Sequence, residues 1–249
     1  MARHFLGLEG AMTVPTEAFL LTHRAVSDLH TTGAMGVVHG EAGLGKTFAV
    51  DDALARCEGV QACAVSFPSR PSMRVVALGL LQALTRAASL ELNRFQATQQ
   101  LLEELGQRHR VVVVDEAQRL NRECIEYLRH LHDHPATTFA LLLVGGDGCW
   151  EVLSREPMLR SRIYRRVTFR PLTNQEVLRM IGDYHPLYHS VPDELVLFVD
   201  DHFGHGNWRN WAAFTHSAAT LCRRSGRDRL DEDVARNVFA LHGGGVATR

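Results

Sequence analysis

Apolar residues follow two alternating patterns over residues 1–171. Short runs rich in valine and leucine, bounded by charge or glycine, predict strands, and apolar residues spaced three or four positions apart predict helices between them. The predicted strands are 34–40 (AMGVVHG), 60–67 (VQACAVSF), 110–117 (RVVVVDEA), 138–146 (TFALLLVGG) and 165–172 (RRVTFRPL). The predicted helices cover 15–30, 46–57, 73–88, 95–109 and 124–134, with a short element at 149–163.

Strands that alternate with helices predict an α/β fold in which helices sandwich a parallel sheet. The run at 110–117 is nearly continuous in β-branched residues, which is typical of a strand buried on both faces of such a sheet. The strand at 165–172 carries several charges and is predicted to be more exposed.

After residue 172 the chain is predicted to be helical only. Thr173 and Glu176 have the spacing of a capping box at the start of the first of these helices. The others are predicted at 193–203, 207–224 and 231–242. We therefore expect an α/β part with an N-terminal helix over 1–171, a small helical lid over 172–242 and a flexible tail over 243–249.

Composition narrows the class of protein. The chain of 249 residues is 45% hydrophobic and 22% charged, which is typical of a folded globular protein. Its apolar stretches are shorter than the roughly 18–20 residues that a membrane span needs. Residues 1–19 lack a long apolar run and a convincing small-residue cleavage site, so a cytoplasmic location without membrane contact is expected. The five cysteines include no C-x-x-C pair and are predicted to be reduced core thiols.

The formal net charge of −1 excludes a strong polycation, but DNA binding depends on where charge lies rather than on its sum. Arginines concentrate locally at 160–170 and at 223–229. His130 and His134 lie four apart on a predicted helix, but no third ligand is evident, so metal binding there is not expected.

A glycine-rich segment between the first strand and the next helix matches the phosphate-loop pattern G-x-x-x-x-G-K-[ST]. The glycines let backbone N–H groups curl around a phosphate, and the following helix presents its positive end. Lys46 is the only lysine in the chain, and its compact charge suits a tight loop better than a planar guanidinium. The residues expected to bind ATP are Gly40, Glu41, Ala42, Gly43, Leu44, Gly45, Lys46 and Thr47.

Two acidic residues, Asp115 and Glu116, end the strongly apolar run at 110–117. Ligands of open α/β sheets bind at the carboxyl ends of the strands, where these carboxylates are predicted. We expect Thr47 and Asp115 to hold Mg²⁺, and Glu116 to orient and polarise the water that attacks the γ-phosphate. The sequence thus predicts a Mg²⁺-dependent ATPase.

From Gly40 to Arg209 the chain resembles the AAA+ ATPases, and more narrowly the transposition regulators of the TnsC, TniB and MuB kind. Related secretion and replication-initiator ATPases are also similar. The resemblance rests on the phosphate loop, VVVVDEAQRL, LLLVGGDGCWEVLSREPMLRSRI with RRVTFRPLTNQEV, and GHGNWRNW.

This resemblance implies further site residues. Arg162 corresponds to the arginine finger that reaches the ATP of an adjacent subunit, with Arg160 or Arg165 as substitutes. Arg209 corresponds to the lid arginine that senses the γ-phosphate. Val14 and Pro15 correspond to residues that line the adenine pocket.

The sensor strand departs from the family. Relatives often have a polar Asn, Thr or Gln where this chain has Gly146, and Asp147 follows directly. The sequence leaves open whether Asp147 replaces that side chain, and hence how fast the protein hydrolyses ATP.

The resemblance also implies DNA contacts between the second strand and the strand that ends in Asp115. There Arg74 and Arg94 are the first candidates, with Arg70 and Asn93 second. Contacts of this kind to phosphates give affinity that is independent of sequence and sensitive to salt.

The leading functional hypothesis is an ATP-dependent, DNA-binding regulator of transposition. Its ATP-bound subunits would form a ring or helical filament on duplex DNA and recruit a transposase or target selector, and hydrolysis would dismantle the assembly. One alternative is an assembly or signalling ATPase of the secretion or sensor type that does not bind DNA. Another is a slow nucleotide switch, which Gly146 favours.

Overall fold

The computed structural model describes residues 7–87 and 91–243, so all but the first residue of the predicted tail over 243–249 lies outside the described residues. The chain divides into two compact units. We call Glu17–Ala42 with Lys46–Phe169 the α/β unit, and Met1–Thr16, Gly43–Gly45 and Arg170–Arg249 the helical unit.

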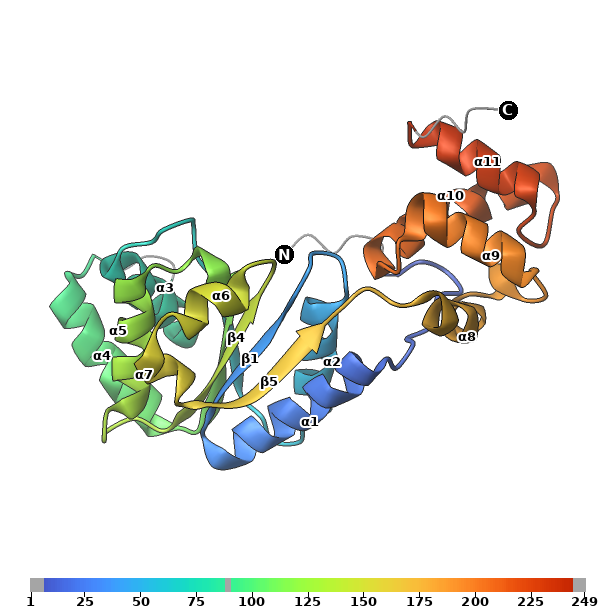
Figure 1. The fold of residues 1–249 in the computed structure, drawn as a ribbon. Coiled ribbons are helices and arrows are strands. Elements are labelled where there is room, and N and C mark those ends of the chain that lie inside the picture. The colour runs from blue at the N-terminus through green and yellow to red at the C-terminus, as the bar shows by residue number, and fades with distance from the viewer. Residues whose placement is uncertain (1–6, 88–90, 244–249) are drawn as a thin grey trace. The chain divides into compact units, whose positions relative to one another are not determined.

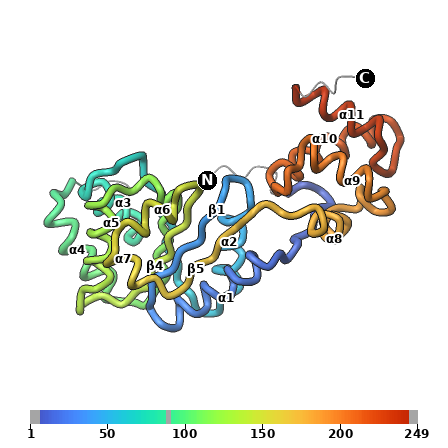
Figure 2. The backbone as a smooth tube through the Cα atoms, viewed as in Figure 1, coloured from blue at the N-terminus to red at the C-terminus, as the bar shows by residue number. Residues whose placement is uncertain are grey.

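The α/β unit is built on a five-stranded sheet in the order β2-β3-β4-β1-β5. Figures 1 and 2 label three of these strands, β4, β1 and β5. All neighbouring strands are parallel, so their carboxyl ends share one edge of the sheet. The α/β fold with a parallel sheet that was predicted from the sequence is confirmed. The strands are β1 (Met35–Gly40), β2 (Ala62–Ser66), β3 (Arg110–Asp115), β4 (Phe139–Gly145) and β5 (Ile163–Phe169).

Helices cover both faces of this sheet (Figure 1). On one face α1 contacts β1, β4 and β5, and α2 packs against α1 and β1. On the other face the remaining helices share a continuous apolar core with the strands. The helices are α1 (Glu17–Thr32), α2 (Lys46–Arg56), α3 (Met73–Thr85), α4 (Arg94–Gln107), α5 (Arg122–Asp133), α6 (Cys149–Ser154) and α7 (Pro157–Arg160), with a 3₁₀ turn η1 (Ala117–Arg119).

Burial of the central strands follows from this sandwich. Every residue of β3 and β4 is buried, as the continuous apolar runs predict for strands covered on both faces. In the edge strands β2 and β5, exposed positions alternate with buried or half-buried ones instead. The sheet therefore places its most apolar strands at the centre.

Several predicted boundaries differ from the structure for local reasons. The helix predicted over 73–88 ends at Thr85, because Arg86 adopts a left-handed conformation with φ 57°. The short element predicted at 149–163 is two helices, the second of which begins at Pro157, since proline suits the first turn of a helix. The helix predicted over 193–203 ends at Val199 and continues as a π-helical turn.

The helical unit has its own apolar core, in which Trp211 and Phe214 are fully buried. Its first helix begins with the predicted capping box, since the Thr173 N–H donates to Glu176 and the Glu176 N–H donates to Thr173. Its elements are α8 (Asn174–Tyr184), η2 (Pro186–Tyr188), α9 (Asp193–Val199), the π-helical η3 (Asp200–Gly204), α10 (Trp208–Ser225) and α11 (Glu232–Leu241).

Other sequence expectations can be compared with the described residues. All five cysteines are free thiols there, and four of them are buried. Among these residues no helix is both long and apolar enough to span a membrane. The rings of His130 and His134 lie 6.1 Å apart, and the described part of the chain has no group of three or more metal-ligating side chains of the His, Cys, Asp and Glu types.

Asp200 organises the turn before α10. Its carboxylate is buried and accepts hydrogen bonds from the Gly206 N–H at 2.8 Å and from the Trp211 indole N–H at 3.0 Å. Both donors would lose their partner if the carboxylate were removed, and an unsatisfied buried donor costs more than a hydrogen bond contributes.

We predict that Asp200→Ala destabilises the helical unit by about 2–4 kcal/mol, because two buried N–H groups lose their acceptor. Urea denaturation followed by tryptophan fluorescence measures the change. Asp201→Ala is the matched control, since the Asp201 side chain is 84% exposed and its loss is expected to cost at most about 0.5 kcal/mol. Equal midpoints for the two variants would contradict this role of Asp200.

Candidate functional site

The phosphate-loop segment follows β1 at the carboxyl edge of the sheet and requires glycine for two reasons. A Cβ on Gly40 would lie 2.1 Å from the Phe169 carbonyl oxygen on β5, so no side chain fits there. Gly43 and Gly45 have φ of +86° and +91°, which L side chains rarely adopt. The close approach of β5 and these backbone angles together account for the glycines in the motif.

The two residues after this segment open α2. Lys46 is only 8% exposed, and its Nζ donates a hydrogen bond to the Glu41 carbonyl at 2.5 Å, across the turn. The Thr47 hydroxyl donates to the Asp115 carboxylate at 3.5 Å. The first turn of a helix also carries partial positive charge from its N–H groups. An anion bound beside Lys46 and Thr47 would therefore contact both the Lys46 ammonium group and the N-terminus of α2.

Asp115 ends β3 and is buried. Burial raises the pKa of its carboxyl, against the backbone hydrogen bond that it accepts from the Glu116 N–H at 2.8 Å. Adjacent oxygens around an octahedral Mg²⁺ lie about 3 Å apart, so the Thr47 hydroxyl and the Asp115 carboxylate are close enough to bind one ion. Two oxygen donors, one of them an anionic group without a full solvent shell, fit this hard cation.

Glu116 has a left-handed backbone conformation, with φ 57° and ψ 38°, which is uncommon for a residue other than glycine. Its carboxylate Oε2 accepts a hydrogen bond from Gln118 at 2.7 Å and lies 3.4 Å from the Arg119 guanidinium. This backbone conformation sets the direction of the Glu116 side chain, and the Gln118 amide makes the shorter of the two contacts to its carboxylate.

Gly146 directly follows β4, where relatives often have a polar side chain. Its backbone N–H donates to the Gln118 side-chain oxygen at 3.0 Å. Asp147 is exposed, and within the described residues its side chain has no hydrogen bond or ion pair. Sequence reasoning missed Gln118, because its position two residues after Glu116 does not reveal that it reaches a different strand.

Arg162 lies at the opposite edge of the sheet. It precedes Ile163, which pairs with the first residue of β1, whereas Gly40 ends β1. Five residue steps along β1 correspond to about 17 Å, more than an arginine side chain extends. Arg162 cannot therefore reach the phosphate-loop segment of its own chain.

The arginines around this edge have partners in their own chain. Arg162 donates to Asp133 at 2.8 Å and to the Met158 carbonyl at 2.9 Å. Arg165 pairs with Asp28 at 2.7 Å, and Arg160 is exposed. Although burial alone would raise the pKa of Asp133, its hydrogen bonds and charge interactions with Arg162 and Arg129 hold that pKa below its usual range.

Three predicted nucleotide contacts belong to the helical unit. Val14 is half-buried, and Pro15 and Arg209 are exposed. Arg209 is the second residue of α10, and within this unit its backbone N–H lies 3.0 Å from the Gly43 carbonyl and 3.0 Å from the Asn207 side-chain oxygen that caps the helix. Their roles toward a nucleotide stay predictions.

The four candidate DNA contacts lie near the first turns of α3 and α4. Arg74 donates to the Leu92 carbonyl at 3.1 Å, and the Arg94 guanidinium lies 3.7 Å from the sulfur of Met73, so the two arginines are neighbours. The Arg70 N–H donates to the Arg119 carbonyl at 3.0 Å.

Asn93 has a structural task as well, because its side chain caps α4 in a reciprocal pair with Gln96. Phe95, which sequence reasoning missed, is 73% exposed. The Arg94 guanidinium lies over the Phe95 ring, 4.5 Å from the ring centre. We call Arg70, Arg74, Arg94 and Phe95 the basic surface.

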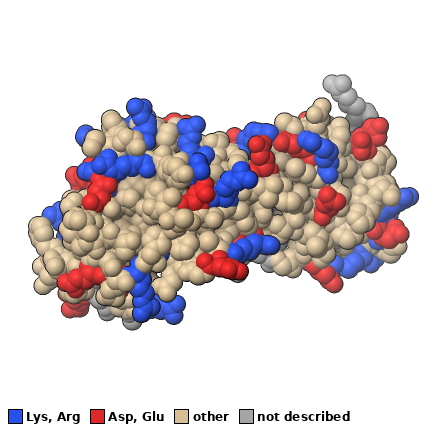
Figure 3. Space-filling model, turned by 90° about the horizontal axis from the view of Figure 1, so that it is seen from below, with Lys and Arg blue, Asp and Glu red and all other residues tan. Residues whose placement is uncertain are grey.

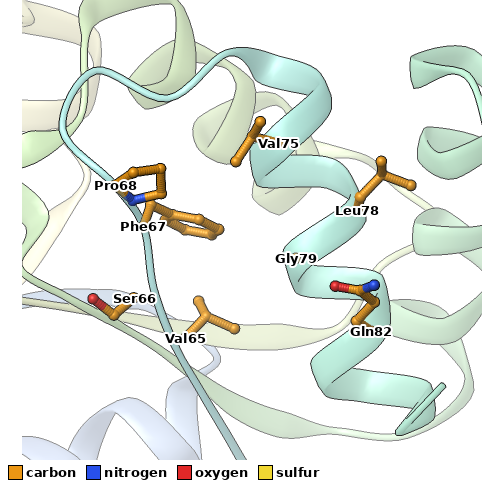
Figure 4. A pocket seen from close by; sticks show the side chains of 8 residues that line it. All are labelled: Val65, Ser66, Phe67, Pro68, Val75, Leu78, Gly79 and Gln82. Carbon is orange, nitrogen blue, oxygen red and sulfur yellow. The ribbon is translucent and has the colours of Figure 1, made fainter. Parts of the chain in front are cut away.

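A separate pocket lies on the same edge of the α/β unit (Figure 4). It lies between the end of the edge strand β2 and α3, and Val75 in its lining directly follows Arg74. None of the predicted nucleotide-binding residues lines it. Its lining residues are Val65, Ser66, Phe67, Pro68, Val75, Leu78, Gly79 and Gln82.

Residues 29–153 match the protein family described as "AAA domain", which covers 125 of the 249 residues. No curated protein matches the sequence. The solved structure of the ORC2 protein of Aeropyrum pernix, as ADPNP–ADP complexes, has a TM-score of 0.69 and 16% identity, with 100% of this chain and 72% of that chain covered.

Two further solved structures have similar scores. Cdc6p of Pyrobaculum aerophilum gives a TM-score of 0.75 at 16% identity, with 95% of this chain and 70% of that chain covered. The ORC1 protein of Aeropyrum pernix in complex with DNA gives 0.70 at 16% identity, with 96% and 68% covered. At such identity these likenesses concern the fold, which is the P-loop AAA+ fold expected from the sequence.

We predict that Asp115→Asn stabilises the nucleotide-free protein near neutral pH. Because the folded-state pKa of Asp115 is raised, the native state holds this proton more tightly than the unfolded state, and stability falls as pH rises through that pKa. Asparagine removes this cost, so the gain in Tm should be full at about pH 8 and vanish toward about pH 4.

Thermal unfolding of both proteins across this pH range measures the difference. Asp133→Asn is the control of opposite sign, since the pKa of Asp133 is lowered and its ionised form stabilises the fold at neutral pH. A lower Tm for Asp115→Asn at about pH 8 would show that the ionised carboxylate is not costly there.

Proposed function

Since the chain belongs to the AAA domain family, we propose that it is a Mg²⁺-dependent ATPase that assembles on double-stranded DNA and regulates transposition. The observation that carries the proposal is the convergence of Lys46, Thr47, Asp115 and Glu116 at one edge of the sheet while Arg162 lies at the other.

The chemistry follows from what each group can do there. Lys46 and the backbone N–H groups after Gly40 bind the phosphates. Glu116 takes a proton from water as the water oxygen bonds to the γ-phosphorus, and the bond to the β,γ-bridging oxygen breaks with its electron pair leaving on ADP. Thr47 and Asp115 would hold Mg²⁺, which would supply positive charge to the phosphate oxygens.

The position of Arg162 is the reason that the proposed ATPase acts as an oligomer. A guanidinium that stabilises the transferring phosphoryl group speeds such reactions strongly, but Arg162 lies about 17 Å of strand length away from its own phosphate-loop segment. A second copy, whose phosphate-loop edge meets this edge of the sheet, brings the two together. Repeating this head-to-tail contact generates a ring or a helical filament. ATP would then favour assembly, since its γ-phosphate is bound by two subunits.

The basic surface supports DNA as the partner. Arg74 and Arg94 are neighbours, and Phe95 offers an exposed aromatic ring beside them. On the face drawn in Figure 3, basic and acidic side chains are interspersed rather than separated into one broad field. Binding would depend on a few local phosphate contacts, as the net charge of −1 also implies. Arg70 and Asn93 are the secondary DNA contacts in this proposal. Arg209 keeps its predicted role as the arginine that senses the γ-phosphate.

The role in transposition rests on the sequence resemblance to TnsC, TniB and MuB, and on the fold. In this role the assembly marks target DNA, a transposase or target selector binds it, and hydrolysis releases the subunits. The ORC1 protein whose structure was solved with DNA shares the fold, which supports DNA as the surface on which assembly occurs.

We predict that Lys46→Ala and Arg162→Ala are each inactive but complement each other. Lys46→Ala lacks phosphate binding yet keeps its Arg162, and Arg162→Ala loses on the order of 10³-fold in turnover yet keeps its phosphate-loop residues. In an equimolar mixture about a quarter of head-to-tail contacts join an intact site to an intact arginine, so about a quarter of wild-type turnover should return.

Phosphate release in the presence of duplex DNA measures this turnover. Arg155→Ala, an exposed arginine of the same segment, is the control and should keep wild-type turnover. A mixture no more active than its two components would contradict action between subunits. Complementation by Arg160→Ala or Arg165→Ala in place of Arg162→Ala would assign the role to that arginine instead.

We predict that Arg74→Ala and Arg94→Ala weaken ATP-dependent binding of duplex DNA without changing ATP binding. Each lost phosphate contact should lower the slope of log affinity against log salt by about 0.9. Fluorescence anisotropy at two salt concentrations, with negative-stain microscopy of the assemblies, measures both effects.

Arg224→Ala is the matched control, because Arg224 is exposed in the second arginine cluster and should bind DNA as the wild type does. Assembly that depends on ATP but is indifferent to DNA at either salt concentration would favour an ATPase of the secretion or sensor type over a DNA-binding regulator.

A further inference from the structure

The side chain of Gln118 connects the two strands that end beside the candidate catalytic site. Its amide nitrogen donates to Glu116 Oε2 at 2.7 Å, and its amide oxygen accepts from the Gly146 N–H at 3.0 Å. One amide thus contacts the residue after β3 and the residue after β4. Gln118 itself is half-buried in the 3₁₀ turn η1.

Gly145, which ends β4, and Gly146, which follows it, leave room for this amide. A Cβ on Gly145 would lie 2.6 Å from the Gln118 oxygen, and a Cβ on Gly146 would lie 3.3 Å from its nitrogen. A polar side chain at position 146 would therefore compete with Gln118 for the same space. The amide that this strand lacks is supplied from η1.

The turn η1 holds Gln118 firmly enough for this task. Ala117 is fully buried, and its carbonyl accepts the Leu120 N–H at 3.1 Å. The Arg119 N–H closes the turn on the Glu116 carbonyl at 2.9 Å. The backbone on both sides of Gln118 is therefore held by hydrogen bonds, and the side-chain amide joins Glu116 to Gly146.

Arg119 is the other group that faces the same carboxylate oxygen. Its guanidinium lies 3.4 Å from Glu116 Oε2, and the side chains of this pair are 46% and 41% exposed. An ion pair this exposed is screened by solvent and contributes little. The Gln118 amide makes the shorter contact and is anchored at its other end.

We propose that Gln118 is a positioning residue for ATP hydrolysis that replaces the polar side chain absent at Gly146. It binds Oε2 of Glu116, so that Oε1 is directed toward the attacking water and accepts its proton. This role rests on the hydrolysis proposed above. It also means that Gly146 does not make the protein a slow switch, since the Gln118 amide from η1 takes the place of the absent polar side chain.

Steady-state ATP hydrolysis by the full chain with duplex DNA tests the role. Gln118→Ala should lower kcat roughly 10-fold or more, a part of what a positioned general base contributes, and leave KM within about 2-fold. The affinity for ADP should stay at the wild-type value, because no nucleotide contact is lost. The Tm should fall only slightly, because the half-buried Gly146 N–H loses its acceptor. Arg119→Ala, which removes the other contact to the same oxygen, should lower kcat less.

A second substitution separates positioning from structure. Gly146→Asn should lower kcat in the wild-type background, because its Cβ crowds the Gln118 amide at 3.3 Å. The same change in Gln118→Ala should raise kcat, because the new amide takes the vacated space. A change of sign between the two backgrounds is the signature of one shared position.

Three results would overturn the role: an unchanged kcat in Gln118→Ala, a fall in kcat matched by a fall in ADP affinity, or an equal effect of Gly146→Asn in both backgrounds. Glu116→Gln supplies the baseline for hydrolysis. Wild-type turnover no higher than that of Glu116→Gln would overturn the proposed ATPase and this role with it. Wild-type turnover that survives Gln118→Ala overturns this role alone.

Discussion

The parallel pairing of β1 between β4 and β5 is the constraint on which the rest of the site depends. Parallel register brings every strand's carboxyl end to one edge, so that Gly40, Asp115 and Gly145 end neighbouring strands there. The same register sends Arg162 to the opposite edge. The proposed phosphate binding within one chain and the proposed arginine contact between two chains would therefore both follow from a single topology.

Glycine is used at this edge to admit another part of the chain. The Phe169 carbonyl of β5 lies close to Gly40, and the Gln118 amide lies close to Gly146. The first glycine belongs to a motif with a known physical reason, so its need is evident from the sequence. In the sequence, Gly146 looks like the loss of a polar side chain, because Gln118, which contacts it, lies 28 residues away in the chain.

The basic residues of the α/β unit differ in the contacts that they make. Lys46, the lone lysine, curls onto its own turn, where a wide planar guanidinium would have to displace the Glu41 carbonyl. Arg162 and Arg165 form ion pairs in their own chain, so a neighbouring subunit would compete with Asp133 for Arg162. Arg74 and Arg94 are neighbours although 20 positions separate them, because α3 and α4 pack side by side.

The sequence by itself determined the approximate positions of the strands and the parallel α/β fold, because each depends on local periodicity. It also predicted a phosphate-binding segment and an acidic pair at the end of β3 from short motifs. Helix ends such as that at Thr85 needed the backbone angle of Arg86, which no pattern of apolar residues encodes. Only the tertiary structure decided that Gln118 joins Glu116 to Gly146 and that Arg162 lies out of reach of its own phosphate-binding segment. Both depend on strand order and register, which bring together or separate residues far apart in the chain.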